Sequence, residues 1–291
     1  MPFAAGGNAD IVGRIMGEVV YGALKQPVVV DNKPGAGGAV GAELAARAAA
    51  DGYTMLVASN GPMTVNQFVN AKMTYDPFKD FVPVALSSYV PHVIAVSNAL
   101  GVATVGELVA KSKGGTINLG TSGIGSATHM TLARFQHASG ANVTHVPYRG
   151  GGSLLPDVIS GTLDGAVTEL STVMELHKAG KLKIIGVASD KRAPLVPDVP
   201  TFDEGGVKGF TAVSYVGLVA PAKIPPEYVE TVARTIAQGL TPGSAGAAKL
   251  LSQGSIIATA EEMTPAGFGA FLRKEFDAMA AAAKVAGIVP Q

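Results

Sequence analysis

The sequence contains no cysteine and no tryptophan among its 291 residues. The absence of cysteine excludes disulfide scaffolds, thiolate zinc sites, cysteine nucleophiles and iron–sulfur clusters, so cysteine usage says nothing about the redox compartment. Charge of either sign is scarce and balanced, since 22 lysines and arginines stand against 22 aspartates and glutamates. A net charge of zero gives no basic surface, and we expect neither nucleic acid nor an anionic membrane as a partner.

Long apolar runs and a leader sequence are not found either. No stretch of about 18 uncharged apolar residues occurs, so the sequence predicts no membrane-spanning helix. Residues 1–7 lack the basic and apolar regions of a secretory signal. We therefore expect either a cytoplasmic protein or a chain that begins after its targeting segment. A chain of this length should form two compact domains or one large one.

Short β-branched runs alternate with helical patterns along most of the chain, which predicts an α/β fold with a mostly parallel sheet. Buried strands are expected at residues 27–30, 53–58, 117–120, 143–146 and 183–188. Helices are expected to start at Asp10, Thr104, Thr172, Thr241 and Thr264, from capping residues and from the prolines that follow the last two. The last helix carries phenylalanines on one face, so it should pack on a core.

Two long extended stretches interrupt this alternation, at residues 81–96 and 213–219. Two such extended segments are expected when a chain leaves its first domain, forms a second domain and then returns to the first. We therefore predict a discontinuous first domain of residues 1–96 plus 214–291, and a second domain of residues 97–213.

The motifs of common catalysts are not found in the sequence. The five histidines form no HExxH motif and no pair at i, i+4, so no metal site is predicted. Neither the GxSxG elbow of hydrolases nor the GxxxxGK[ST] phosphate loop occurs. The glycine loop at residues 34–41 has Val40 where a dinucleotide fingerprint has its third glycine. We therefore predict no metal and no cofactor.

Six loops of small and polar residues follow predicted strands, at the edge where open α/β sheets bind ligands. They lie at residues 4–10, 34–41, 59–61, 120–129, 146–153 and 169–171. Free backbone N–H groups before a helix favour negative charge, so these loops suit a carboxylate. The alternatives are a plain connection for residues 4–10, a tight helix-entry turn for residues 34–41 and a serine-rich cap for residues 120–129. Arg149 is either a bidentate carboxylate clamp or a solvated loop charge.

Six segments of the chain resemble the Bug/TctC family, the extracytoplasmic solute receptors of tripartite tricarboxylate transporters. They occur in order at residues 2–12 (PFAAGGNADIV), 31–38 (DNKPGAGG), 51–54 (DGYT), 75–81 (YDPFKDF), 145–151 (HVPYRGG) and 197–202 (PDVPTF). The resemblance implies a type II periplasmic-binding-protein fold, in which two α/β domains joined by a two-strand hinge close on the ligand. It also implies an organic carboxylate held by main-chain groups, waters and hydroxyls.

The resemblance implies site residues by their position in these motifs. Three groups match: Ala4, Ala5, Gly6, Gly7 and Asp10 in the first loop; Ser59 after the third strand of the family; and Thr121, Ser122, Ser126 and His129 at a helix start in the second domain. Asn60, Arg149 and Glu169 complete the candidate set. Many members have Asp where this chain has Thr168. Members also normally have a signal peptide and an apolar strand before the Pro-Phe pair, and neither is found in this sequence.

We therefore expect a monomeric, non-catalytic receptor in the periplasm. It would capture a di- or tricarboxylate or an aromatic acid, and membrane transporter subunits or a sensor would read its closed form. One alternative is an α/β enzyme that acts on a carboxylate in the same cleft, with His129, Asp10 or Glu169 as the general base. Another is a cytoplasmic effector-sensing module with a protein partner.

Overall fold

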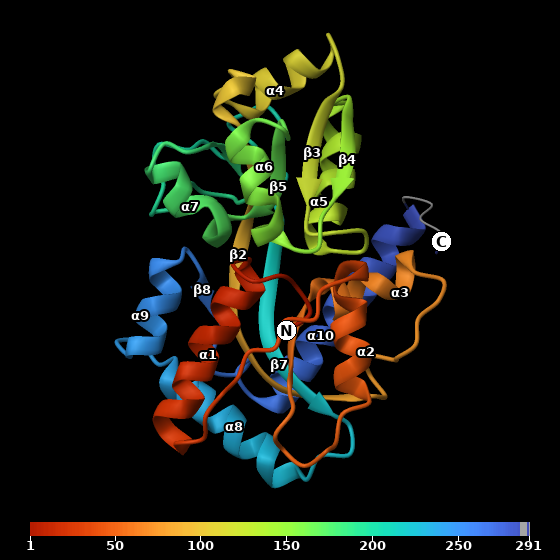
Figure 1. Cartoon of the computed structure of the whole chain (residues 1–291), viewed down its shortest axis with the longest axis vertical. Coiled ribbons are helices and arrows are strands. Elements are labelled where there is room, and N and C mark those ends of the chain that lie inside the picture. Colours follow the sequence, from red (N-terminus) through yellow and green to blue (C-terminus); the bar gives the residue numbers. More distant parts are fainter. Residues whose placement is uncertain (286–289, 291) are drawn as a thin grey trace.

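The computed structural model describes residues 1–285 and residue 290, which form two sheets surrounded by helices (Figure 1). The first sheet contains β1 (Leu56–Ser59), β7 (Val213–Pro221), the first part of β2 (Phe81–Val96) and β8 (Ile256–Ile257). The second sheet contains the end of β2 with β3 (Ile117–Thr121), β4 (Val143–Pro147), β5 (Gly165–Glu169) and β6 (Lys183–Val187).

Strands β2 and β7 connect the two halves of the molecule. Up to Pro91, strand β2 pairs antiparallel with β7; from His92 onward it pairs with β5, and it joins β6 one residue later. In Figure 1 both strands run between an upper and a lower group of helices. The extended stretches predicted at residues 81–96 and 213–219 are confirmed as these two strands.

The predicted α/β class is confirmed, but the expectation of a mostly parallel sheet is wrong. Among the described residues, β3 pairs in parallel with β4 and β5, and the other paired strands are antiparallel. The reason is the path of the chain, which leaves the lower half on β2 and returns on β7 in the opposite direction. The strands that pair with these two also run antiparallel to them: β1 with β7, and β5, β6 and β8 with β2.

Helices gather around each sheet (Figure 1). The lower group consists of α1 (Asn8–Leu24), α2 (Ala39–Ala46), α3 (Asn66–Val69), α8 (Pro226–Gly239), α9 (Ala245–Ser252) and α10 (Pro265–Val285). The upper group consists of α4 (Val105–Ser112), α5 (Ala127–Ser139), α6 (Leu155–Ser160) and α7 (Leu170–Lys178). None of the described helices combines the length and hydropathy needed to cross a bilayer.

Hydrophobic cores lie in both halves. One cluster joins residues 3–86 to residues 215–272 in the lower half. In the upper half, Ile94 and Val96 belong to one cluster, and Val93 and Ala95 belong to another. Since alternate residues of a strand point to opposite faces, both faces of the upper sheet are covered. The domain boundaries at residues 96 and 213 remain a prediction, and residues 286–289 and 291 of the predicted first domain lie outside the described residues.

Two predicted helix starts and the packing of the last helix are confirmed. Thr104 Oγ1 accepts a hydrogen bond from the Glu107 N–H at 3.2 Å and caps α4. Thr264 precedes α10, and its Oγ1 accepts from the Gly267 N–H at 3.0 Å. Phe268 of α10 is fully buried, as expected for a helix that packs on a core.

The other three helix starts are wrong. Helix α1 begins two residues before Asp10, and α7 begins after Glu169, so that Thr172 lies inside it. Thr241 lies in a turn, and Ser244 caps α9 instead. In each case a residue with good capping chemistry has another role: Thr172, for example, accepts a hydrogen bond from the Asn8 N–H of the opposite half.

No strand forms at residues 27–30, and the strand expected at residues 53–58 begins only at Leu56. Val28 and Val29 are 46% and 87% exposed. A strand requires a partner for its backbone groups, and the described residues place none beside this segment. A groove of about 550 Å³ lies there, lined by α1, residues 26–31 and β1. Within the described part of the chain, strand β1 therefore pairs with β7 alone.

Candidate functional site

A small cavity lies between the upper and lower halves of the molecule. Its solvent-accessible volume is about 20 Å³, which is room for about one water molecule. Its lining comes from both halves and consists of Phe3, Gly7, Asn8, Ala9, Ser59, Asn60, Gly61, Ser122, Ser126, Ala127, Gly151, Glu169 and Ser214. Glu169 is the one ionisable side chain in this lining. The cavity is thus a tight polar space between the halves, and the described part of its lining holds no cationic side chain.

Three helices begin at this cavity. Helix α1 starts after Gly7, α5 after Ser126 and α7 after Glu169, and these three flanking residues all line the cavity. The first N–H groups of a helix have no partner within it, and the helix dipole adds partial positive charge at the same end. The three starts together favour an anion without any lysine or arginine.

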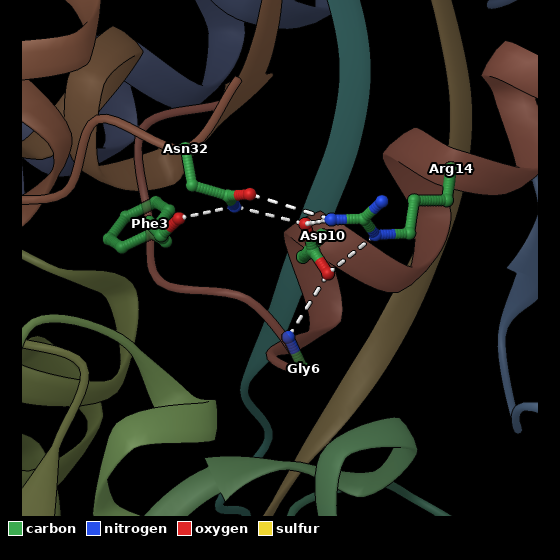
Figure 2. A network of polar contacts seen from close by, with 5 residues as sticks. All are labelled: Phe3, Gly6, Asp10, Arg14 and Asn32. Carbon is green, nitrogen blue, oxygen red and sulfur yellow. Dashed lines mark hydrogen bonds and ion pairs between the residues drawn. The ribbon is translucent and has the colours of Figure 1, made fainter. Parts of the chain in front are cut away.

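Asp10 holds the loop before α1 in place (Figure 2). Its carboxylate accepts hydrogen bonds from Arg14 Nε at 2.9 Å, Asn32 Nδ2 at 3.0 Å and the Gly6 N–H at 3.0 Å. Burial acts to raise the pKa of Asp10, but the hydrogen bonds outweigh it and the pKa is lowered. Asn32 also donates to the carbonyl oxygen of Phe3, so this network ties the start of the chain to α1. Asp10 positions the loop and does not line the cavity.

Two polar residues at the end of β1 reach the cavity, Ser59 as its last residue and Asn60 directly after it. Ser59 is 7% exposed, and its Oγ has no hydrogen-bond partner among the described residues. Asn60 is held by the backbone of β7, because its Oδ1 accepts from the Tyr215 N–H at 3.1 Å. Ser59 thus brings a free hydroxyl to the cavity wall, and a buried polar atom of this kind normally has a partner.

The start of α5 supplies two more hydroxyls. Ser126 Oγ accepts from the His129 N–H at 3.2 Å, and Ser122 follows β3 directly. Thr121 is fully buried behind them, with its Oγ1 2.7 Å from His145 Nε2. Ser122 and Ser126 line the cavity, whereas Thr121 does not.

His129 and Arg149 both lie away from the cavity lining. The His129 ring stacks on His145 with 4.3 Å between centroids, its Nδ1 accepts from the Gly125 N–H, and burial lowers its pKa. The side chain of Arg149 is exposed beside a separate pocket, and its carbonyl oxygen accepts from the Ala4 N–H at 3.1 Å.

Six of the residues expected from the sequence therefore meet at the cavity, namely Gly7, Ser59, Asn60, Ser122, Ser126 and Glu169. The structure places the others outside its lining: Ala4, Ala5, Gly6, Asp10, Thr121, His129 and Arg149. Seven lining residues were not expected: Phe3, Asn8, Ala9, Gly61, Ala127, Gly151 and Ser214. Most of these belong to or adjoin the expected loops, but no motif in the sequence marks Ser214.

The two halves touch each other around the cavity. The Asn8 N–H donates to Thr172 Oγ1 at 3.1 Å, and Asn8 Oδ1 accepts from Ser171 Oγ at 2.9 Å. The backbone of Gly7 also packs against Gly151 and Gly152. These contacts enclose the cavity on the side of α1 and α7.

Ser214 belongs to a buried polar chain that the sequence did not predict. Ser214 Oγ lies 3.1 Å from Glu169 Oε1 and 2.7 Å from His92 Nε2, and His92 Nδ1 lies 2.7 Å from Thr131 Oγ1. Burial lowers the pKa of His92 to about 3, so the ring is neutral. The structure thus brings a serine and a histidine together, although the sequence contains no motif for such a pair. Within residues 1–285 and 290, no three side chains are placed to hold a metal ion.

Two α/β halves joined by paired strands, with a polar cavity between them, define a solute-binding protein. The model of the tripartite tricarboxylate transporter family receptor, TctC, matches residues 12–260, and the chain belongs to this family. The resemblance seen in the sequence is thereby confirmed.

Similar proteins support the same assignment. BugT of Bordetella pertussis is 31% identical over 243 residues, which are 82% of this chain and 74% of BugT. The structure of Rpa4515 of R. palustris with adipate has a TM-score of 0.93 at 30% identity and covers 100% of this chain and 96% of that one. The periplasmic binding protein BugD has a TM-score of 0.93 at 31% identity, with 100% and 97% covered. MatC of Rhodopseudomonas palustris with bound malate has a TM-score of 0.90 at 27% identity, with 97% and 96% covered.

Proposed function

We propose that the protein captures a small organic carboxylate in the cavity between its two halves, as the receptor of a tripartite transporter. The observation that carries this proposal is the convergence of the starts of α1, α5 and α7 on a cavity without a cationic side chain. Adipate and malate, the molecules named with two similar structures, are both dicarboxylates.

Each half would supply part of the binding site. The start of α1 and the hydroxyl of Ser59 come from the lower half, and the starts of α5 and α7 come from the upper half. A ligand held from both sides binds the closed form more tightly than the open form, and this difference drives closure. Predicted domains of residues 1–96 plus 214–291 and 97–213 would then move about β2 and β7. The separate hydrophobic cores support this division.

We further propose that the protein works in the periplasm as a monomer and hands its ligand to membrane subunits. The description of BugD as a periplasmic binding protein supports the location.

Binding without turnover is the function that the side chains support best. Asp10 is fully engaged by Arg14, Asn32 and Gly6, and it lies outside the cavity lining. His92 contacts Ser214, but its pKa of about 3 makes it a weak base at neutral pH. The alternative of an enzyme acting on a carboxylate is tested by incubating the protein with each acid and analysing the products by chromatography. Conversion of any acid would contradict simple binding.

A thermal-shift and calorimetric screen tests the carboxylate proposal. The panel contains adipate, malate, tricarboxylates, aromatic acids and acidic amino acids, with neutral sugars as controls. An acid present at about 100 times its Kd should stabilise the fold by about 2.7 kcal/mol and raise the Tm clearly. A flat response to every acid from correctly folded protein would refute the proposal.

Two serines provide a matched pair of variants. Ser59 and Ser255 are both buried and both have an Oγ without a partner among the described residues, but Ser59 alone lines the cavity. Ser59→Ala should weaken binding of the acid about tenfold, because one hydrogen bond to a charged group is lost. Ser255→Ala should leave the Kd unchanged. Equal effects of the two variants would exclude Ser59 from the site.

A further inference from the structure

Glu169 is the feature of the cavity that a carboxylate receptor does not obviously need. It lies at the end of β5 directly before α7, is 9% exposed, and lines the cavity. Its two carboxyl oxygens contact hydroxyls, Ser214 Oγ at 3.1 Å and Thr168 Oγ1 at 3.3 Å. An acidic group therefore stands in the wall of a cavity that otherwise favours anions.

Among the residues that the structure describes, no cationic side chain pairs with Glu169. Burial raises its pKa, while hydrogen bonds from its own N–H, Ser214 and Thr168 oppose the shift. On the side of β2, Glu169 faces His92. The hydroxyl of Ser214 lies between the two side chains, and the His92 ring is neutral. On the neighbouring helices, Arg134 of α5 donates to the Thr211 carbonyl and Asp10 of α1 is paired with Arg14.

The contacts of His92 and Ser214 allow two proton arrangements. A neutral imidazole has one donor and one acceptor nitrogen. When Nε2 carries the proton, it donates to Ser214, and Ser214 donates to an ionised Glu169. When Nδ1 carries the proton, it donates to Thr131, Ser214 donates to Nε2, and a protonated Glu169 donates to Ser214. Every hydrogen bond of the chain from Thr131 to Glu169 is kept in both arrangements.

A ligand carboxylate in this cavity would lie in the same low-dielectric space as Glu169. Two carboxylates that share a site without a cation cannot both remain ionised, so one of them is protonated. We propose that Glu169 takes up one proton when a carboxylate enters the cavity, with His92 and Ser214 reversing their hydrogen bonds to accommodate it. The proton comes from the buffer acid, and the ligand is chemically unchanged.

This inference rests on the proposed function and adds a rule of selectivity. A simple carboxylate binds with proton uptake, so its affinity falls as the pH rises above the pKa of Glu169 in the free protein. A zwitterionic amino acid can place its ammonium group beside the ionised Glu169 and bind without uptake. Glu169 would thus determine which acids the cleft accepts at a given pH.

Calorimetry in pairs of buffers with different ionisation enthalpies measures the protons taken up. Titrations with adipate and with malate are made between about pH 6.5 and pH 9, where the carboxyl groups of both free acids are already ionised and raised pKa values of buried carboxyl groups still fall within the range. The wild-type protein should take up nearly one proton at the upper end, where the Kd should rise by up to about tenfold per pH unit. Glu169→Gln should still bind, with no uptake and a Kd that is independent of pH. Glu175→Gln, an exposed carboxylate on α7, should behave like the wild type.

The two proposals fail in different ways in this experiment. Binding heat without proton uptake at any pH would overturn the role of Glu169 and leave the receptor function intact. Uptake that persists in Glu169→Gln would overturn it as well, since another group would then carry the proton. The absence of binding heat for every acid would refute the receptor function itself, and the role of Glu169 with it.

Discussion

Ser171 Oγ donates a hydrogen bond of 2.9 Å to Asn8 Oδ1 of the opposite half of the molecule, although the two residues are 163 positions apart. Both residues lie in the first turn of a helix, Asn8 in α1 and Ser171 in α7. The contact therefore joins two of the helix starts proposed to hold the ligand, and it exists only when the halves are together.

Removal of this contact should weaken the closed form. Ser171→Ala loses one buried neutral hydrogen bond worth about 1 kcal/mol, so the Kd for adipate should rise about fivefold. Ser160→Ala, an exposed serine at the end of α6, is the control and should leave the Kd unchanged. Isothermal calorimetry gives the Kd, and small-angle scattering gives the compaction on binding. An unchanged Kd in Ser171→Ala would mean that closure does not depend on this contact.

A methyl group at Gly152 should prevent closure by collision. A Cβ built at Gly152 meets the carbonyl oxygen of Ala5 in the opposite half, and the atoms it meets are backbone atoms that cannot rotate away. Gly152→Ala should therefore lower ligand affinity by at least about tenfold with little change in the Tm of the free protein. At Gly115 an added Cβ meets nothing within 4 Å, so Gly115→Ala is the control. Tight binding by Gly152→Ala would show that the ligand-bound form is more open than this structure.

Loss of the charge on Asp10 should destabilise the first loop in a pH-dependent way. Its pKa is lowered in the folded protein from an ordinary value of 3.8. The ionised form therefore stabilises the fold above that value, and the contribution is lost as the pH falls through the lower folded pKa. Asp10→Asn should cost about 2 kcal/mol at neutral pH, because three donors lose a charged acceptor. Urea unfolding should show the cost shrinking at acid pH, with the exposed Asp31→Asn as the reference at each pH.

Ser214 should set the pH at which Glu169 takes up its proton. The hydrogen bond from Ser214 lowers the pKa of Glu169, so its removal should raise that pKa further. In Ser214→Ala the pH range of proton uptake should therefore move upward, while the number of protons stays near one. Buffer-pair calorimetry across the pH range gives the midpoint. A midpoint that moves downward would contradict the assignment of Ser214 as a donor to the ionised carboxyl.

Much of the fold was predictable because its signals are local. The β-branched runs of β3, β4 and β6 are bounded by small or polar residues, and the long strands β2 and β7 stand out by length. The segment at residues 27–30 has the same local pattern but forms no strand, because strand formation also needs a neighbour. The starts of α7 and α9 were missed for a similar reason, since Thr172 and Thr241 have suitable chemistry but other positions in the fold.

The candidate site was predictable as a set of loops and not as a set of side chains. Glycine and serine content located the loops after β1, β3 and β5. Which residue of a loop lines the cavity depends on the direction of its side chain, as the neighbours Thr121 and Ser122 show. His92 lies within the apolar run of β2, and its meeting with Ser214 of β7 depends on the pairing of two strands more than 100 positions apart. No pattern in the sequence could indicate that meeting.

In the part of the chain that the structure describes, β1 has a neighbouring strand on one side only, and this has a consequence for association between molecules. A strand with one open edge offers backbone donors and acceptors to any extended chain that reaches them, which is the usual starting point of edge-to-edge aggregation. Here the apolar segment at residues 27–30 and helix α1 border that edge across a groove. The protein is thus shielded at β1 by neighbouring segments and not by a completed sheet. Heat or denaturant that loosens this shield would expose a template for intermolecular strand exchange before the rest of the fold is lost.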